Sequence, residues 1–173
     1  MGILGKKVLV LGLSKSGIAA AKLAKKHGAV VYLTEGKDVT SENLYKVEEL
    51  KNLGINVEYG AHSDEFINKA DLVVTSPGIP PHSEIIQRIR KQNIPVISEL
   101  ELAYRECDIP FIIITGTNGK TTTTSLTGEL FKNANKDTYI VGNIGNPIIG
   151  TVESASKESY LISELSSFQL ESV

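Results

Sequence analysis

The sequence is poor in the residues that build disulfides, thiolate metal sites and membrane segments. Its 173 residues include one cysteine, Cys107, and no tryptophan. A single cysteine can form neither an intramolecular disulfide nor a cysteine-based zinc site, which fits a reducing compartment. No apolar run reaches the roughly 18 residues of a membrane helix, and no charged and apolar leader opens the chain. We therefore expect a cytoplasmic protein without membrane insertion.

The chain also lacks an excess of charge of one sign. Lysine and arginine number 18 and aspartate and glutamate 20, which gives a net charge of −2 and a pI near 5.9. The basic residues form no stripe, so nucleic acid is not expected as the main partner. His27, His62 and His82 are isolated in the sequence, and we expect surface or helix-end roles for them.

Hydrophobic periodicity predicts an α/β fold. Short apolar runs alternate with helical stretches, which is the pattern of a parallel sheet built from strand–helix–strand units. The expected strands span residues 8–11, 30–33, 56–59, 72–75, 96–97, 111–115, 138–141 and 160–162. The expected helices span residues 17–27, 44–53, 85–92 and 98–105, and a further helix starts near Lys120.

The pattern divides into two units. Residues 1–97 complete a five-strand pattern, and Ser98 with Glu101 forms a capping box that opens the next helix, so we place the boundary there. The unit 98–173 has only three strands, and a small parallel sheet with an open edge is a poor free-standing fold. We expect the chain to be the N-terminal part of a longer protein. A complete small protein with an unusual C-terminus is the alternative.

The most informative motif lies between strand 111–115 and the helix near Lys120. The four apolar residues before Thr115 leave no polar face, which is typical of a parallel strand covered on both sides. A glycine-rich loop follows, with the residues Gly116, Thr117, Asn118, Gly119, Lys120, Thr121 and Thr122.

This loop carries the groups that hold a nucleoside triphosphate. Gly116 and Gly119 let the main chain approach an anion, and the N–H groups of the following helix point at it. Lys120 supplies a charge for the outer phosphates, and Thr121 offers a hydroxyl to Mg²⁺. Ile114 stands where the general P-loop has its first glycine, so this is a shorter form. An ordinary glycine-rich turn is the alternative.

Two further loops follow strands of the first unit. G-L-S-K-S-G at residues 12–17 is a dinucleotide fingerprint with Ser14 in place of its second glycine, which disfavours NAD but keeps the helix N-terminus as an anion site. Glu35 ends the second strand, where it can accept hydrogen bonds from a ribose or a base, or be a solvated loop carboxylate. Gly78 in S-P-G-I-P-P follows the fourth strand, where a glycine allows close approach of a ligand. A plain turn, which proline and glycine commonly make, is the alternative.

Polar residues also end the strands of the second unit. Asn143 in G-N-I-G follows strand 138–141, and Glu164 in E-L-S-S-F-Q-L-E follows strand 160–162. Because parallel strands end at one edge of a sheet, we expect both residues near Lys120. Glu164 is a hard oxygen ligand for Mg²⁺, and Asn143 can hold a phosphate or water. A carboxylate that merely caps the strand end remains the alternative.

Taken together and in order, these motifs resemble the Mur ligases of peptidoglycan synthesis over essentially the whole chain. The loop 116–122 is shared by a wider superfamily that includes folylpolyglutamate and cyanophycin synthetases. The stretch 164–171 is narrower and is similar to members that add D-glutamate. The resemblance implies a Rossmann-like domain at 1–97 that binds the UDP-substrate and, at 98–173, the beginning of an ATP-binding central domain with a P-loop. It also implies a monomer.

The resemblance assigns roles residue by residue. It implies ATP at Gly116 to Thr122, Mg²⁺ at Thr121 and Glu164, and catalytic roles for Lys120, Asn143 and Glu164. The residues that it implies for the UDP-substrate are Ser14, Lys15 and Ser16 at the uridine diphosphate, Glu35 and Gly36 at the uracil, Gly78 and Asn143 at the diphosphate, and Ser166 and Gln169 at the muramoyl part.

The implied reaction is ATP-dependent amide formation. ATP phosphorylates the carboxylate of UDP-N-acetylmuramoyl-L-alanine, and the amine of D-glutamate attacks the acyl phosphate. The family's later catalytic groups would lie beyond Val173, so we expect this chain alone to be inactive. The alternatives are another amide ligase of the superfamily, a non-catalytic nucleotide-binding fragment, and an NAD-dependent oxidoreductase, which does not explain the loop at Gly116.

Overall fold

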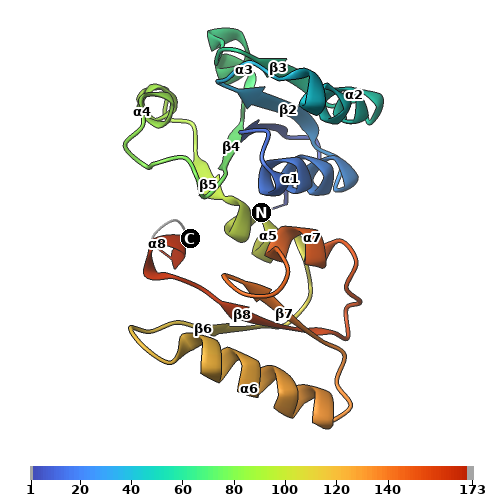
Figure 1. The fold of residues 1–173 in the computed structure, drawn as a ribbon. Helices are drawn as coiled ribbons and strands as arrows, with labels where there is room; N and C mark the ends of the chain where they lie inside the picture. The colour runs from blue at the N-terminus through green and yellow to red at the C-terminus, as the bar shows by residue number, and fades with distance from the viewer. Residues whose placement is uncertain (1, 171–173) are drawn as a thin grey trace.

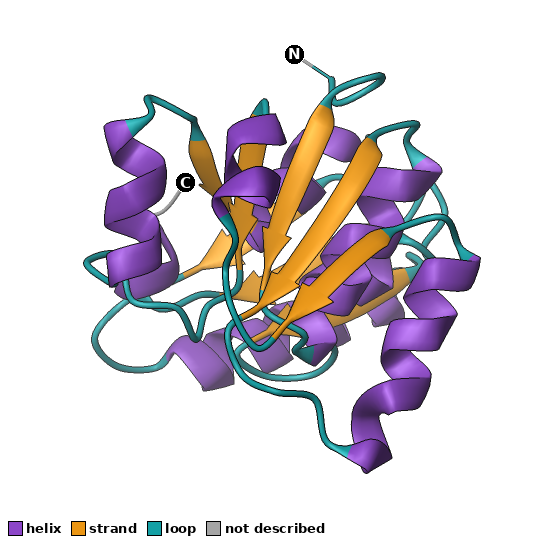
Figure 2. Ribbon diagram, turned by 90° about the horizontal axis from the view of Figure 1, so that it is seen from above, coloured by secondary structure: helices purple, strands orange, loops and turns teal. Residues whose placement is uncertain are grey.

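Two parallel β-sheets form the frame of the molecule, as Figures 1 and 2 show. The computed structural model describes residues 2–170. The first sheet has the strand order β3-β2-β1-β4-β5, and the second has the order β6-β8-β7. Every pairing between these strands is parallel, so the predicted α/β class is confirmed. Within the described residues, no helix is both long enough and apolar enough to cross a membrane.

The direction in which the chain adds strands to the first sheet reverses at β1, although all the strands are parallel. The chain winds from β1 outward to β2 and β3, then returns to the other side of β1 for β4 and β5. A crevice therefore opens where the carboxyl ends of β1 and β4 diverge, which is the ligand site of doubly wound folds. The strands are β1 (Lys7–Leu11), β2 (Val30–Glu35), β3 (Asn56–Tyr59), β4 (Leu72–Thr75) and β5 (Val96–Ser98).

Helices cover both faces of this sheet. The side chains of β1 alternate between two apolar clusters, one on each face, and the helices bury both clusters. Val8 and Val10 belong to the cluster under α1, whereas Leu9 and Leu11 join residues of α3 and α4 on the other face. All four side chains are fully buried. The helical segments are α1 (Lys15–Lys26), η1 (Ser41–Asn43), α2 (Leu44–Asn52), α3 (Asp64–Lys69) and α4 (Glu84–Lys91).

The second sheet is covered less completely. Its strands are β6 (Phe111–Ile114), β7 (Thr138–Gly142) and β8 (Tyr160–Glu164), and its helices are α6 (Lys120–Asn133), α7 (Ile148–Val152) and α8 (Ser167–Leu170). The expectation that the strand before Thr115 is covered on both sides is wrong for this chain. β6 lies at the edge of the sheet, and 46% of Ile113 is exposed. Leu126 and Leu130 of α6 are also exposed.

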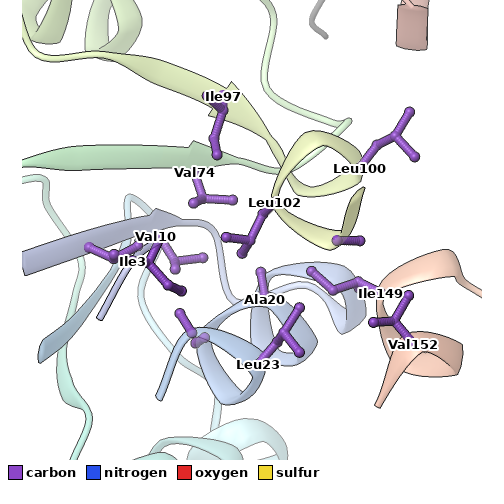
Figure 3. Close-up of a cluster of buried hydrophobic side chains, with 14 of the residues drawn as sticks. Ile3, Val10, Ala20, Leu23, Val74, Ile97, Leu100, Leu102, Ile149 and Val152 are labelled. Carbon is purple, nitrogen blue, oxygen red and sulfur yellow. The ribbon is translucent and has the colours of Figure 1, made fainter. Parts of the chain in front are cut away.

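Helix α5 (Glu99–Glu106) joins the two sheets through a shared apolar core. Figure 3 shows Leu102 of α5 above Ala20 of α1, with Leu23 of α1 below and with Ile149 and Val152 of α7 to the right. Leu102 is completely buried. Half of the predicted capping box is present at the start of α5, since the Ser98 hydroxyl accepts a hydrogen bond of 3.1 Å from the Glu101 N–H. The Glu101 carboxylate pairs with Arg105 of the same helix. The domain boundary near Ser98 remains a prediction, because α5 contacts elements on both sides of it.

Candidate nucleotide and substrate site

The two loops at the crevice of the first sheet are tied together by serine hydroxyls. Ser76, which follows β4, donates to the Leu11 carbonyl at 2.9 Å, and Ser14 donates to Ser76 at 3.3 Å. Ser14 is also the N-cap of α1 and accepts from the Gly17 N–H at 3.2 Å. A Cβ on Gly17 would lie 2.1 Å from the Gly12 carbonyl oxygen. Only glycine at position 17 therefore allows the turn to pack this closely on the helix.

A cavity of about 530 Å³ lies beside this turn, and we call it the β1–β2 pocket. Glu35 lines it, but both carboxylate oxygens already accept backbone hydrogen bonds, from the Leu13 N–H at 2.9 Å and the Lys37 N–H at 3.0 Å. Glu35 thus braces two loops, and any ligand contact would use its remaining lone pairs. Other lining residues include Gly12, Ser14, Gly36, Asn43, Lys46, His62, Ser76 and Gly78.

His62 is the histidine among the described lining residues of this pocket. Its Nδ1 lies 2.8 Å from the hydroxyl of buried Thr34, and its Nε2 is so near the loop that a Cβ on Gly36 would be 2.7 Å away. Burial lowers the pKa of His62, which Arg88 also lowers, while the carboxylates of Glu35 and Glu58 oppose the shift. The imidazole is therefore biased toward its neutral form.

A second cavity, of about 890 Å³, lies between the two sheets, and we call it the inter-sheet cleft. It shares Ser76, Gly78, Ile79 and Pro80 with the β1–β2 pocket. A ligand with a base at one end and a sugar at the other can therefore run from one cavity into the next. Other lining residues include Ser16, Arg90, Glu99, Glu101, Arg105, Gly142, Ile148 and Gln169.

Glu99 is a largely buried carboxyl on the wall of this cleft. Its Oε2 is buried without a hydrogen-bond partner among residues 2–170, and Ser16 lines the same cleft. Burial raises the pKa of Glu99.

The glycine-rich loop opens α6 at the carboxyl end of β6. Gly119, the N-cap of α6, has a φ of 77°, and no side-chain hydrogen bond to the cap occurs within the described residues. The first N–H groups of α6 are therefore available to an anion. Lys120 Nζ donates to the Gly116 carbonyl at 2.6 Å, which keeps the ammonium over the loop.

Glu164 lies at the base of this loop, as expected. It pairs in register with Ile114 at the end of β6 and with Gly142 at the end of β7, and its backbone carbonyl accepts from the Asn143 N–H at 2.9 Å. The carboxyl is buried, and Oε2 has no hydrogen-bond partner in the described part of the chain. An unpaired carboxylate oxygen beside a phosphate loop fits a Mg²⁺ ligand.

The rest of a Mg²⁺ shell would come from Thr121 and from oxygens outside the protein. Residues 2–170 hold no group of three or more histidine, cysteine, aspartate or glutamate side chains that could hold a metal by themselves. Mg²⁺ commonly uses one or two protein ligands and takes the rest from water and phosphate, so this sparse donor set suits it.

The structure gathers most of the predicted residues around the two cavities and one sheet edge. Ser14, Glu35, Gly36 and Gly78 line the β1–β2 pocket, and Ser16, Gly78 and Gln169 line the inter-sheet cleft. Gln169 Oε1 also accepts from the Ser166 hydroxyl at 3.0 Å. Lys15 is exposed and lies in the lining of neither cavity as described. Glu171, which ends the predicted signature, lies outside the described residues.

Sequence reasoning missed His62 and Glu99. The first was expected at the surface, and the second was read only as part of a capping helix. Both follow strands of the first sheet, since His62 comes shortly after β3 and Glu99 directly after β5. The rule that parallel strands end at one edge, applied to these two short strands, would have found them.

Comparison with known families and proteins decides where this arrangement belongs. Residues 6–98 match the N-terminal domain of MurD-like Mur ligases, and residues 114–172 match the Mur ligase middle domain. The chain belongs to the Mur ligase family. The first of these matches alone spans more than half of the chain.

Individual members of the Mur ligase family are similar over the whole chain. A UDP-N-acetylmuramoylalanine–D-glutamate ligase of Thermoanaerobacter sp. is 45% identical over 100% of this chain and 38% of its own length. The enzyme of the same name from Clostridioides difficile is 47% identical with the same coverage. The chain thus spans about 38% of the length of these curated relatives.

Solved structures agree on the fold. A pseudomurein peptide ligase type C from Methanothermus fervidus has a TM-score of 0.55 at 23% identity, over 94% of this chain and 33% of that one. The UDP-N-acetylmuramate-alanine ligase MurC of Thermotoga maritima has a TM-score of 0.52 at 22% identity, over 93% and 37%.

Proposed function

We propose that this chain is the substrate-binding and phosphate-binding part of a Mur ligase that joins D-glutamate to UDP-N-acetylmuramoyl-L-alanine. The observation that carries the proposal is that the β1–β2 pocket and the inter-sheet cleft share four lining residues, and that the cleft is lined by residues that follow strands of both sheets. The similarity to D-glutamate ligases over the whole chain supports the choice of substrate.

In this proposal the substrate lies along the two cavities. The uracil occupies the β1–β2 pocket near Glu35 and Gly36. The diphosphate lies across the shared wall, at the N-terminus of α1 with Ser14, Lys15 and Ser16, between Gly78 and Asn143. The muramoyl part reaches Ser166 and Gln169, which directs the alanyl carboxylate toward the sheet edge that carries the phosphate loop.

The phosphate loop and Glu164 then serve ATP. Residues Gly116 to Thr122 would surround the phosphates with backbone N–H groups, and the Lys120 ammonium would neutralise the outer phosphate. Thr121 and Glu164 would hold Mg²⁺, which when bound supplies further positive charge to the phosphates. The amide of Asn143, which follows β7, would hold a phosphate or a water molecule at the same edge of the sheet. These residues bind, align and neutralise charge.

Amide formation would proceed in two steps. A carboxylate oxygen of the substrate attacks the γ-phosphorus of ATP, and ADP leaves as an acyl phosphate forms. The amine of D-glutamate attacks the acyl carbon, loses a proton and expels phosphate. No residue described above is placed to receive the amine, so we propose that this chain alone does not form the amide. We further propose that the ligase acts as a cytoplasmic monomer.

Substitution of Gly78 tests the proposed substrate path. Gly78 lines both cavities, has no positive φ, and a Cβ there would meet no described atom within 4 Å. Gly78→Val should therefore leave folding intact but obstruct the shared wall. Calorimetric titration should give binding of UDP-N-acetylmuramoyl-L-alanine by the unmodified chain and a loss of about tenfold or more in the variant, equivalent to 1.4 kcal/mol.

Gly150→Ala is the control, because a Cβ there also meets no described atom within 4 Å and Gly150, which is exposed in α7, lines neither cavity as described. It should bind like the unmodified chain. NAD titrated in parallel distinguishes the rival oxidoreductase. If NAD binds as well as the uridine nucleotide, or if Gly78→Val binds normally, the proposed path is wrong.

A further inference from the structure

His62 is held at the wall of the β1–β2 pocket by contacts on its ring and on its backbone. Its Nδ1 lies 2.8 Å from the Oγ1 of Thr34, a residue that is completely buried. Its carbonyl accepts a hydrogen bond of 3.1 Å from Arg88, and the N–H of the next residue, Ser63, donates to Glu58 at 3.0 Å. The imidazole ring is therefore positioned before any ligand binds.

The loop that follows β2 is shaped around this ring. A Cβ on Gly36 would lie only 2.7 Å from His62 Nε2, and a Cβ on Gly60 would lie 2.6 Å from Asp38 Oδ1. The Gly60 N–H also donates to the Lys37 carbonyl at 3.1 Å. The loops after β2 and β3 thus interlock, and the Nε2 edge of His62 lies against Gly36, which lines the same pocket.

The hydrogen bonds around Thr34 determine which nitrogen of neutral His62 carries the proton. Thr34 Oγ1 has one proton and lies 3.3 Å from the Ala61 carbonyl, which can only accept. When Thr34 donates to Ala61, Nδ1 donates to Thr34, and both contacts are hydrogen bonds. The opposite tautomer would leave two oxygens facing each other without a proton, which is costly at a buried site. Nε2 therefore presents a lone pair.

This lone pair is an acceptor that the protein itself does not use. Among residues 2–170, Nε2 of His62 forms no hydrogen bond. Other acceptors on the pocket wall are already engaged, since both Glu35 oxygens accept backbone N–H groups and Asn43 Oδ1 accepts from Lys46 Nζ at 2.7 Å. A fixed acceptor of this kind orients a ligand that carries a matching N–H group.

Uracil and cytosine differ in the group that they offer to such an acceptor. In a uridine nucleotide the ring atom N3 carries a proton and donates, whereas in a cytidine nucleotide N3 has a lone pair and only accepts. An acceptor facing N3 therefore binds uracil and disfavours cytosine.

We propose that His62 is a specificity-determining residue of the β1–β2 pocket, where its Nε2 accepts a hydrogen bond from the N3–H of uracil and so selects uracil over cytosine. This inference rests on the proposed function, because it assumes that the base of the substrate lies in this pocket.

Calorimetric competition tests the choice of base, with UDP and CDP displacing UDP-N-acetylmuramoyl-L-alanine from the chain. The unmodified chain should prefer UDP by about tenfold or more, because CDP sets a lone pair against Nε2. His62→Leu keeps bulk beside Gly36 but lacks the acceptor, so most of this preference should disappear. His82→Leu is the matched control, since His82 is exposed in a loop and lines neither cavity as described, and it should keep the preference.

His62→Gln separates hydrogen bonding from packing. The glutamine amide can present either its oxygen or its N–H to a base. UDP should bind this variant better than it binds His62→Leu, and CDP should bind it better than it binds the unmodified chain. Circular dichroism of each variant confirms that the comparison is made between folded proteins.

The pH profile supplies a readout that a packing role would not change. Below about pH 6.5 the imidazole takes up a second proton, and Nε2 becomes a donor that suits N3 of cytosine. The preference of the unmodified chain for UDP should therefore shrink as the pH falls, and that of His62→Gln should stay constant. UDP and CDP carry the same diphosphate, so the ratio of their affinities reports the base.

Charged groups surround His62 on several elements and are the same in all these variants. Burial lowers the pKa of His62, as does Arg88 of α4, whereas Glu35 of β2 and Glu58 of β3 raise it. Asp64 of α3 pairs with Arg88. The other charged residues described in the pocket wall are Lys37, Asp38 and Lys46.

The possible outcomes distinguish this inference from the proposed function. If the chain binds UDP-N-acetylmuramoyl-L-alanine but His62→Leu prefers UDP over CDP as strongly as the unmodified chain does, the inference is wrong. A preference of the unmodified chain that stays constant as the pH falls would also overturn it. If the folded, unmodified chain does not bind UDP-N-acetylmuramoyl-L-alanine, the proposed function itself is wrong.

Discussion

Replacement of Gly17 by alanine is the sharpest test of how the turn after β1 is built. A Cβ at this position would lie 2.1 Å from the Gly12 carbonyl oxygen and 3.1 Å from Ser76 Oγ. The nearer obstacle is a backbone atom, so rotation of a side chain cannot relieve the contact. The turn and α1 must instead separate by about 1 Å to restore a normal van der Waals distance.

The energetic cost follows from this displacement. Overpacking a well-packed site typically costs about 1–3 kcal/mol or more, and a rigid backbone obstacle favours the upper part of that range. Alanine recovers about 1 kcal/mol of helix propensity. We therefore expect a net loss of about 2 kcal/mol in the free energy of unfolding, together with weaker binding of UDP-N-acetylmuramoyl-L-alanine, because Ser14 and Ser16 move with the turn.

Urea unfolding followed by far-ultraviolet circular dichroism measures the effect. Gly150→Ala provides the control, since it also replaces a helical glycine, but in open space within the described residues. It should gain about 0.4–1 kcal/mol. Equal stability of the two variants would refute the packing argument at Gly17.

Three further predictions follow from the site and the core. Lys120→Ala should lower ligase turnover of the complete enzyme by about tenfold or more, because a lost charge-assisted hydrogen bond costs about 1.5–3 kcal/mol; turnover within a factor of about two would exclude Lys120 as a phosphate ligand. The pKa of His62 is lower in the native state than in the unfolded chain, so below about pH 6.5 the unfolded chain binds more protons and the free energy of unfolding should fall as the pH drops. His62→Gln should reduce this loss in urea titrations at several pH values. Leu102→Ala should cost about 2–5 kcal/mol and lower hydrogen-exchange protection on both sheets together, whereas loss of protection on one sheet alone would show that α5 does not couple them.

Much of the fold could be predicted because local sequence determines it. The apolar runs at β1 and β4 and the glycine loop before α6 are readable without knowledge of their neighbours. Helices α3 and α7, six and five residues long, were missed because such short segments carry too little periodicity. The exposure of Ile113 was also missed, since an apolar run does not reveal whether a strand lies at the edge of its sheet.

The candidate site was predictable where one strand end carries one motif. Glu164 and Asn143 were expected beside Lys120, and the register of the second sheet places both at the strand ends by the phosphate loop. The shared position of Glu99 and Ser16 on the wall of the cleft could not be predicted from the sequence, because it depends on α5 packing against α1. Nor could the use of both Glu35 oxygens by backbone N–H groups, which depends on two loop conformations.

We propose that one substrate occupies a space built by both sheets. Hydrogen exchange of the chain with and without UDP-N-acetylmuramoyl-L-alanine tests it most directly. We expect slower exchange in four segments together, which are residues 12–17, 35–38, 76–80 and 142–146. Slower exchange confined to the first three segments, or to none of them, would contradict a substrate path that crosses from the first sheet to the second.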